Sequence, residues 1–265
     1  MTTAPQKLPL SVCVIASNEA DRIRRCLDSV KDLASEIVLV HNDCTDGTEA
    51  IARDEYGATL YEEPWHGHRD QKAIALSKAT LPWVLCIDSD EVVSEKLAAS
   101  IRAFVEADDP AFNGAYFPRK VWFLGRWITH GDWYPDHSLR LFRNGKGRWT
   151  GSREHDKIEL DGQARKLDGD LLHFSFRDLN HQASKIAYFG DIFAERKAAK
   201  TKHWHTFPVI FRSFWRFFRA YFIRRGFLDG FPGFYIAFFQ AFATFYRYSK
   251  IYEAKFVRAQ EPPHE

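Results

Sequence analysis

Along the first hundred residues, apolar runs alternate with segments in which apolar positions recur at helical spacing. Short apolar runs rich in β-branched residues predict strands at residues 11–16, 36–40, 59–61 and 83–87. The segments after them predict helices around residues 23–30, 50–51, 71–79 and 97–105, the last with Ser94 as its N-cap. This order with short connections predicts right-handed βαβ units and a mostly parallel sheet.

The pattern changes twice further along the chain. Shorter strands rich in Trp, Gly and Arg predict antiparallel hairpins from about residue 111 to 174, and residues 189–199 predict a helix. Beyond Thr201 the composition becomes aromatic and basic. We therefore predict an α/β domain over residues 1–200 and a helical C-terminal region over residues 201–265.

Polar clusters follow three of the predicted strands, at residues 17–19, 41–46 and 88–91. In an open parallel sheet, ligands bind outside the carboxyl ends of the strands, so the three clusters predict one site. The third contains Asp88 and Asp90, whose carboxylates are close enough in sequence to bind one hard cation, Mg²⁺ or Mn²⁺. An isolated D-x-D often arises by chance, but its place directly after an apolar strand favours a metal that neutralises a diphosphate.

Composition limits the class of protein. With 265 residues, 45% hydrophobic and 27% charged, the chain predicts a folded core and excludes disorder. Its four cysteines have no zinc-finger spacing and indicate buried thiols in a reducing compartment. The first ten residues contain no apolar signal region, so we expect the catalytic part in the cytosol.

Several motifs together resemble glycosyltransferase family 2, whose members have a GT-A fold. They are CVIASNEADRIRRCLDSV, HNDCTDGT and DQKAIALSKATLPWVLCIDSDE. The later runs GDWYPDHSLRLFRNGKGRWTGSREHDKIELDG and RRGFLDGFPGFYIAFFQAF resemble the branch that includes lipopolysaccharide inner-core β-glucosyltransferases. The resemblance extends over nearly the whole chain and implies an inverting transferase that uses a nucleotide sugar.

The resemblance also implies roles for individual residues on the donor side. Asn18 and Glu19 match an acidic motif near the nucleotide, and Lys72 matches a donor-pocket lysine suited to the diphosphate. The full donor-binding prediction is Asn18, Glu19, Asp43, Asp46, Gln71, Lys72, Asp88, Arg140 and Arg143. Asp88 and Asp90 are the predicted metal ligands, with Asp90 the more direct one.

One motif departs from the family. Aspartates that hold the nucleotide usually follow the second strand, whereas this chain has His41 and Asn42 there, with Asp43 in place of a common glycine. Asp46 matches the later aspartate of the motif. The donor base therefore stays open.

For the general base, the branch resemblance points to an H-E-like pair at His155 and Asp156. Asp156 is the predicted base and His155 a metal or phosphate partner, with Asp132 and Asp136 as rival bases. Arg140 and Arg143 would share one side of a strand only across a bulge, or would align on a helical turn. The tryptophans at 122, 127 and 133 fit a sugar-stacking wall or a core, and the histidines at 66 and 68 are interpreted as loop residues.

The C-terminal region suggests attachment to a membrane. Between Thr201 and Arg258 there are ten basic and two acidic side chains in a chain whose total charge is +2, with aromatics interleaved. An interfacial helix explains both features, whereas a core helix pair explains only the aromatics, and no nucleic-acid motif is present. Residues 230–246 are short for a span and contain Pro232 and Gly233, which favours in-plane, peripheral or monotopic attachment at the cytoplasmic face of the inner membrane.

These interpretations lead to one function and two rivals. The expected reaction moves a hexose, by resemblance glucose from UDP-glucose, to a lipid-linked saccharide such as the lipopolysaccharide inner core. A polyprenyl-phosphate sugar synthase would instead use a lipid phosphate as acceptor. A non-catalytic membrane- or sugar-binding protein would keep the fold, and the altered pair His41 and Asn42 is the feature that favours it.

Overall fold

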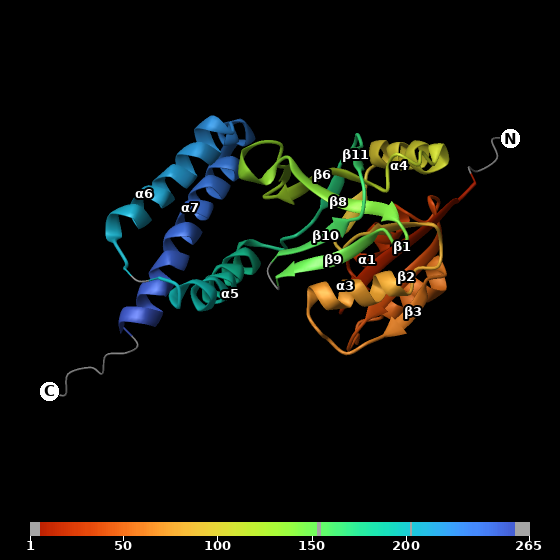
Figure 1. Ribbon diagram of the computed structural model, residues 1–265, viewed down its shortest axis with the longest axis horizontal. Helices are drawn as coiled ribbons and strands as arrows, with labels where there is room; N and C mark the ends of the chain where they lie inside the picture. Colours follow the sequence, from red (N-terminus) through yellow and green to blue (C-terminus); the bar gives the residue numbers. More distant parts are fainter. Residues whose placement is uncertain (1–5, 153–154, 202, 258–265) are drawn as a thin grey trace. The chain divides into compact units, whose positions relative to one another are not determined.

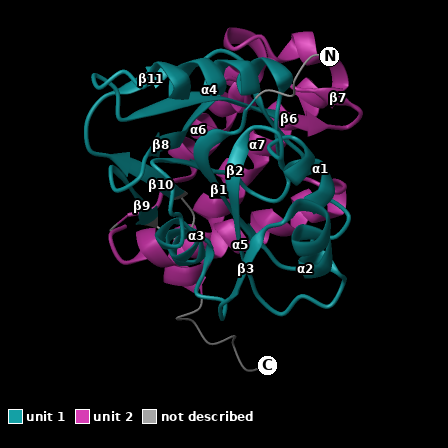
Figure 2. Ribbon diagram, turned by 90° about the vertical axis from the view of Figure 1, so that its right-hand side faces the viewer, with its two compact units in different colours: residues 1–120, 136–175 teal, residues 121–135, 176–265 magenta. Residues whose placement is uncertain are grey.

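A computed structural model describes residues 6–152, 155–201 and 203–257, and Figure 1 shows its helices and strands. The chain divides into two compact units, coloured separately in Figure 2. Unit 1 comprises residues 1–120 and 136–175, and unit 2 comprises residues 121–135 and 176–265. These boundaries differ from those of the domains predicted at residues 1–200 and 201–265, and the domain prediction stays a prediction.

Unit 1 is built on a sheet whose first half is parallel, in the order β3-β2-β1-β4. The strands are β1 (Leu8–Ala16), β2 (Ala34–His41), β3 (Thr59–Glu62) and β4 (Trp83–Cys86). The helices are α1 (Ile23–Asp28), α2 (Thr48–Ala50), the π-helix η1 (Ile51–Glu55), α3 (His68–Ser77) and α4 (Glu95–Ala107). The alternation predicted from the sequence is confirmed, including Ser94, whose side chain accepts a hydrogen bond from the amide of Leu97.

The second half of the sheet is mainly antiparallel and continues from β4 in the order β8-β6-β12-β5, with β11 parallel to β6. These strands are β5 (Glu91–Val93), β6 (Gly114–Phe123), β8 (Asp136–Arg143), β11 (Ala164–Lys166) and β12 (Leu171–His173). A separate hairpin pairs β9 (Gly147–Ser152) with β10 (His155–Leu160). A Cβ at Gly147 would lie 2.5 Å from the ring of Phe142, so glycine lets this hairpin approach β8 closely.

The core of unit 1 lies on both faces of the sheet, because successive side chains of a strand point to opposite sides. Leu10, Val12 and Val14 of β1 pack in a cluster with α1 and α4. Cys13 and Ile15 of the same strand pack on the other face with α3. Burying a leucine or valine side chain stabilises the fold by about 1.5–3 kcal/mol relative to exposure. The two layers therefore fix the carboxyl ends of β1, β2 and β4.

Unit 2 is mostly helical. Its elements are β7 (Arg126–Trp127), the 3-10 helices η2 (Gly131–Trp133) and η4 (Gly226–Asp229), α5 (Leu179–Ala198), α6 (Thr206–Phe218), α7 (Gly230–Tyr252), and the π-helices η3 (Arg219–Ile223) and η5 (Glu253–Val257). The helix predicted at residues 189–199 is the second half of α5. The structure begins this helix at Leu179, after Asp178, whose carboxylate caps it by accepting from the amide of His181 at 2.7 Å.

A buried carboxylate organises the start of unit 2. Asp229 is fully buried and accepts hydrogen bonds from the amides of Thr129 at 3.0 Å and His130 at 2.8 Å. Arg126 Nη2 lies 3.3 Å from the same carboxylate. The tail motif that contains Asp229 thus holds the segment before η2 in place.

The helices of unit 2 leave many large apolar side chains exposed. On α6 only Val209 is buried, whereas Phe207, Phe211 and Phe214 are all more than half exposed. Exposed phenylalanines continue along α7, at positions 231, 234, 238, 242 and 245. Within the described residues, no helix has the length and apolarity needed to cross a bilayer. Large exposed apolar side chains in this number on two helices are typical of an interaction face.

Candidate active site

The three predicted polar segments leave the same edge of the sheet. Strands β1, β2 and β4 are parallel and adjacent, so their carboxyl ends lie side by side. The segments at residues 17–19, 41–46 and 88–91 follow these ends directly. The topology therefore agrees with a single site at this edge.

Asn18 and Asp46 brace the first two of these segments. Asn18 adopts the left-handed conformation, with φ of 54°, and its Oδ1 accepts from the amide of Thr45 at 2.8 Å. Asp46 accepts from the amide of Ala20 at 2.9 Å and from Thr48 Oγ1 at 2.6 Å. Burial raises the pKa of Asp46, but the hydrogen bonds from Thr48 and Ala20 outweigh it and lower the pKa overall. Both predicted donor residues thus have a structural role that the sequence interpretation did not include.

Three neighbouring residues differ in exposure. His41 is buried, and its Nδ1 lies 3.0 Å from Glu49 Oε1. The atoms of His41, Glu49 and Cys44 that could bind a metal lie within 4.8 Å of one another. Gln71 is buried and donates through Nε2 to the carbonyl of Glu63 at 3.1 Å. Asp43 is exposed. Of these three residues, Asp43 alone offers an exposed side chain to a donor.

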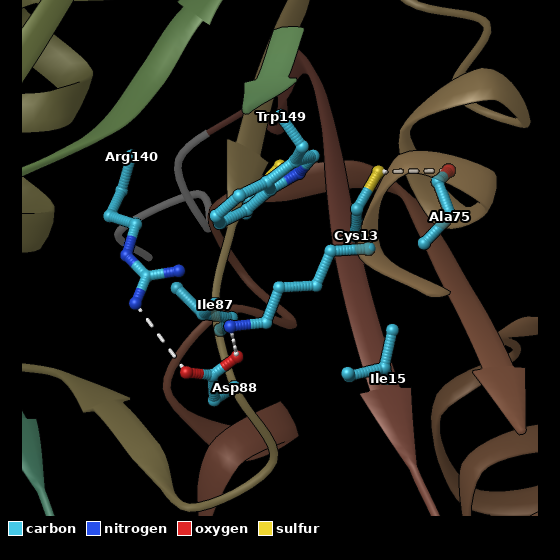
Figure 3. A pocket seen from close by; sticks show the side chains of 9 residues that line it. Cys13, Ile15, Ala75, Ile87, Asp88, Arg140 and Trp149 are labelled. Carbon is cyan, nitrogen blue, oxygen red and sulfur yellow. Dashed lines mark hydrogen bonds and ion pairs between the residues drawn. The ribbon is translucent and has the colours of Figure 1, made fainter. Parts of the chain in front are cut away.

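Lys72 of α3 connects the metal motif to the predicted base. Its Nζ lies 2.8 Å from Asp88 Oδ1 and 2.8 Å from Asp156 Oδ2. The ammonium also lies 5.0 Å from the ring centroid of Trp149, which lines the same small pocket as Asp88 (Figure 3). Three residues predicted from separate motifs are therefore brought together by α3, the turn after β4 and the hairpin β9–β10.

Arg140 joins this group because of a bulge. In the pairing of β6 with β8, Ala115 is opposite Leu141 and Tyr116 is opposite Leu139, which leaves Arg140 as the extra residue. Its Nη2 lies 3.4 Å from Asp88 Oδ2, a contact drawn in Figure 3. The bulge that the sequence analysis considered is therefore present.

Arg143 lies elsewhere. Its Nη1 is 2.6 Å from Asp108 Oδ1, and its guanidinium stacks 4.4 Å from the ring centroid of Trp83. These contacts tie β8 to the end of α4. The structure does not bring Arg143 to the group around Asp88, because the strand directs it toward α4.

Opposing effects set the charge of the central pair. Burial raises the pKa of Asp88, but Lys72 and Arg140 outweigh burial and hold the pKa well below its usual range. Burial lowers the pKa of Lys72 and the repulsion from Arg140 lowers it further, but the carboxylates of Asp88 and Asp156 together outweigh both and raise it. Both groups are therefore charged at neutral pH.

Glu91, which lies within the third predicted polar cluster, stabilises this arrangement. Its fully buried carboxylate accepts from the amide of Asp88 at 2.9 Å and lies 3.5 Å from both Arg140 Nη2 and Arg119 Nη1. Arg119 pairs in turn with Asp136 at 2.6 Å. Asp136, a rival for the base, is thus engaged by an arginine, and no sequence motif singled out Arg119.

Asp90 faces a histidine that the sequence analysis missed. Its Oδ1 lies 3.4 Å from Nε2 of His173, the last residue of β12, and its Oδ2 lies 3.6 Å from Arg22 Nη1. Arg22 is also 3.7 Å from Oε2 of the predicted donor residue Glu19. Burial and the neighbouring Asp88 raise the pKa of Asp90, but the hydrogen bond and electrostatic attraction of His173, together with Arg22, outweigh them and lower it. The antiparallel pairing of β12 with β5, which sets His173 opposite Glu91, is the cause of this proximity.

The side-chain atoms around Asp90 are suitable ligands for a divalent cation. Both Mg²⁺ and Mn²⁺ bind carboxylate oxygens, and Mn²⁺ binds an imidazole nitrogen more readily than Mg²⁺ does. Asp88 adds negative charge nearby, but its two oxygens contact Lys72 and Arg140. Asp90 and His173 are therefore the better candidates for direct ligands.

His155, Asp132 and Trp133 are the remaining predicted residues. His155 is the first residue of β10, and its side chain lies outside what the structure describes. Asp132, the other rival base, is buried in unit 2 against arginines. Trp133 stacks on Phe176 at 5.4 Å within the unit 2 core, which favours the core interpretation for this tryptophan.

The lowered pKa of Asp88 predicts acid sensitivity. An unfolded aspartate titrates near pH 3.9, whereas Asp88 in the folded chain stays ionised below that value. Its contribution to the free energy of unfolding is therefore present above about pH 4 and is lost as the pH falls further. We expect Asp88→Asn to flatten the pH dependence of urea unfolding below pH 4 by up to about 1.4 kcal/mol per pH unit. Glu62→Gln, at the exposed end of β3, is the control, and equal slopes for wild type and Asp88→Asn would contradict the assignment.

Comparison with known proteins gives consistent matches. Residues 11–158 match the model of the family described as "Glycosyl transferase family 2". The "Lipopolysaccharide core biosynthesis glycosyltransferase LpsC" of Rhizobium meliloti (strain 1021) is 30% identical over 260 residues, which cover 96% of each chain. An "Uncharacterized glycosyltransferase" of Rickettsia felis is 29% identical over 264 residues, covering 92% of this chain and 90% of the relative. The crystal structure of S. aureus TarS 1-349 in complex with UDP-GlcNAc has a TM-score of 0.48 and 14% identity, covering 95% of this chain and 91% of that one.

Proposed function

The chain belongs to glycosyl transferase family 2, and from this membership we propose that it is an inverting, metal-dependent enzyme that transfers a hexose from a nucleotide sugar to a lipid-linked saccharide. It is a glycosyltransferase with the GT-A type of α/β fold, as its sequence motifs predicted. The proposal adds the donor, the acceptor, the metal and the residues that act.

The observation that carries the proposal is the double contact of Lys72 with Asp88 and Asp156. A leaving diphosphate needs positive charge at its oxygens, and attack by a hydroxyl needs a base near the same point. Lys72 and Arg140 supply the positive charge, and Asp156 is the base next to it. A divalent cation held by Asp90 and His173 would supply further positive charge to the diphosphate.

In the proposed reaction the acceptor hydroxyl oxygen forms a bond to the anomeric carbon of the sugar. The bond from that carbon to the diphosphate oxygen breaks, and the nucleoside diphosphate leaves with the electron pair. The hydroxyl proton passes to the carboxylate of Asp156. Lys72 and Arg140 stabilise the negative charge that develops on the leaving oxygen.

For the substrates we propose UDP-glucose or a related hexose donor and a saccharide of the lipopolysaccharide core. Full-length similarity to LpsC, whose name places it in lipopolysaccharide core biosynthesis, supports this acceptor. The exposed aromatic side chains of α6 and α7 support in-plane attachment to an anionic membrane, with the catalytic unit on the cytoplasmic face.

A thermal-shift screen tests the donor and the metal together. We expect one of UDP, GDP, CMP and dTDP to raise the melting temperature of wild type in Mn²⁺ and not in EDTA. At a ligand concentration 100 times Kd the gain is about 2.7 kcal/mol. The gain should be lost in Asp90→Ala and kept in Asp21→Ala, an exposed acid in the same region. Equal stabilisation in EDTA would contradict the metal, and no stabilisation by any nucleotide would contradict the proposed function.

A further inference from the structure

Three arginines of unit 2 surround one buried carboxylate. Asp132 of η2 has a side chain only 2% exposed, and its oxygens lie 2.7 Å from Arg216 Nε, 2.9 Å from Arg219 Nη2 and 3.4 Å from Arg224 Nη1. Arg216 belongs to α6, Arg219 to η3, and Arg224 follows η3. A single acid therefore faces three cations inside one compact unit.

A fourth arginine adds to this positive charge. Burial lowers the pKa of Arg216, Asp132 raises it, and the neighbouring Arg219, Arg247 and Arg224 lower it again, so the net shift is downward. Against one carboxylate, the three guanidinium groups that contact Asp132 leave an excess of two positive charges. Within the described part of the chain, the Nε groups of Arg219 and Arg247 are buried without a hydrogen-bond acceptor. We call Arg216, Arg219 and Arg224 the arginine cluster.

A purely structural role does not account for the arginine cluster. One or two arginines suffice to neutralise and orient a buried aspartate, and the side chains of Arg216, Arg219 and Arg224 are 32%, 34% and 48% exposed, so the additional guanidinium groups are accessible to an anion. Guanidinium groups bind phosphate by paired N–H···O contacts, and they do so better than ammonium groups. The anion that best matches these accessible guanidinium groups is therefore a phosphate group.

The position of the cluster indicates where that phosphate comes from. Arg224 is exposed and directly follows Phe222 and Ile223 of η3, which are both more than half exposed. Arg219 is the first residue of the same element. Apolar side chains that enter a bilayer boundary bring adjacent arginines to the depth of lipid headgroups.

We propose that the arginine cluster binds a phosphate group carried on a lipid, and that during the reaction this phosphate belongs to the lipid-linked acceptor. The second part rests on the proposed function. The cluster would thus select phosphorylated lipid among the components of the membrane and retain the acceptor on the enzyme.

Vesicle flotation tests the lipid phosphate. Phosphatidylcholine vesicles are doped with phosphatidic acid, a phosphomonoester, or with phosphatidylserine at matched surface charge. We expect wild type to bind the phosphatidic acid vesicles about tenfold more tightly, since one to two charge-assisted hydrogen bonds are at stake. Arg219→Lys/Arg224→Lys should keep binding to phosphatidylserine and lose the preference, because lysine keeps the charge and lacks the paired geometry.

The control is Arg212→Gln, an exposed arginine on α6 whose guanidinium lies 5.3 Å from the ring centroid of Tyr248. It should keep the preference for phosphatidic acid. Circular dichroism of each variant establishes that it is folded. Equal binding of wild type to the two kinds of vesicle, or an unchanged preference in the double lysine variant, would overturn the proposal.

A second arm separates lipid phosphate from free phosphate. Inorganic phosphate and pyrophosphate are added as competitors. Weak competition at concentrations far above that of the accessible lipid supports binding of a lipid phosphate. Full displacement at equal concentration assigns the site to a free anion instead. Hydrolysis of UDP-glucose by wild type, without acceptor, is measured separately. Absence of hydrolysis would count against the proposed function, whereas the vesicle comparison tests binding of the lipid phosphate independently of it.

Discussion

Replacing Asp156 by asparagine is expected to lower kcat about 10²–10⁴-fold, the range for loss of a general base, while nucleotide binding is kept. The amide cannot accept the acceptor proton. It has nearly the shape of the carboxylate and keeps an oxygen that can face Lys72, which lies 2.8 Å from Asp156 in the wild type. Because the lysine then loses one of its two anionic partners, its affinity for a diphosphate should stay the same or increase.

The measurement is release of nucleoside diphosphate with saturating acceptor, together with titration of the nucleotide into each variant. Glu159→Gln is the matched control, because Glu159 is an exposed carboxylate on the same strand, paired with Arg148 at 2.9 Å. It should behave as wild type. Near-normal turnover of Asp156→Asn would rule out this residue as the base, and weaker nucleotide binding would show that Asp156 acts on the donor side.

The parallel half of the fold and the metal motif could be predicted because their signals are local. Strands β1, β2 and β4 are short apolar runs, and buried side chains on both faces leave few alternatives to a parallel sheet. Asp88 and Asp90 follow β4 directly, so strand topology alone places them at the ligand-binding edge. The start of α5 was missed because residues 179–188 lack a clear apolar repeat, and only the cap at Asp178 marks it.

The support of the site could not be predicted, since it depends on contacts between distant segments. Arg140 reaches Asp88 through a bulge in the pairing of β8 with β6, and nothing in LRLFR reveals which residue is the extra one. His173 reaches Asp90 through strand register, and Arg119 reaches Glu91 across the sheet. Arg143 resembles Arg140 in sequence and yet packs on Asp108. Such differences come from tertiary geometry, which residue types alone do not encode.

Lys72→Met should have an effect of comparable size but a different signature. Removing one preorganised group that stabilises a developing oxyanion typically lowers kcat about 10²–10³-fold. Here the loss also leaves Asp88 and Asp156 near each other without the cation between them, so a negatively charged diphosphate meets more repulsion. We therefore expect weaker nucleotide binding as well as slower turnover, whereas Asp156→Asn should slow turnover without weakening nucleotide binding. Lys78→Met, at the end of α3 and 3.7 Å from Glu63, is the matched control.

The combination of the two substitutions tests whether Lys72 and Asp156 act on one transition state. Residues in direct contact show coupled effects, so the double variant should lose less activity than the two single losses multiplied together. Asp156→Asn should also restore part of the nucleotide affinity that Lys72→Met removes, because it takes away one of the two negative charges that repel the diphosphate. Independent, fully multiplicative losses would mean that the 2.8 Å contact between Lys72 and Asp156 has no part in transfer, and the base would then have to be sought away from this ion pair.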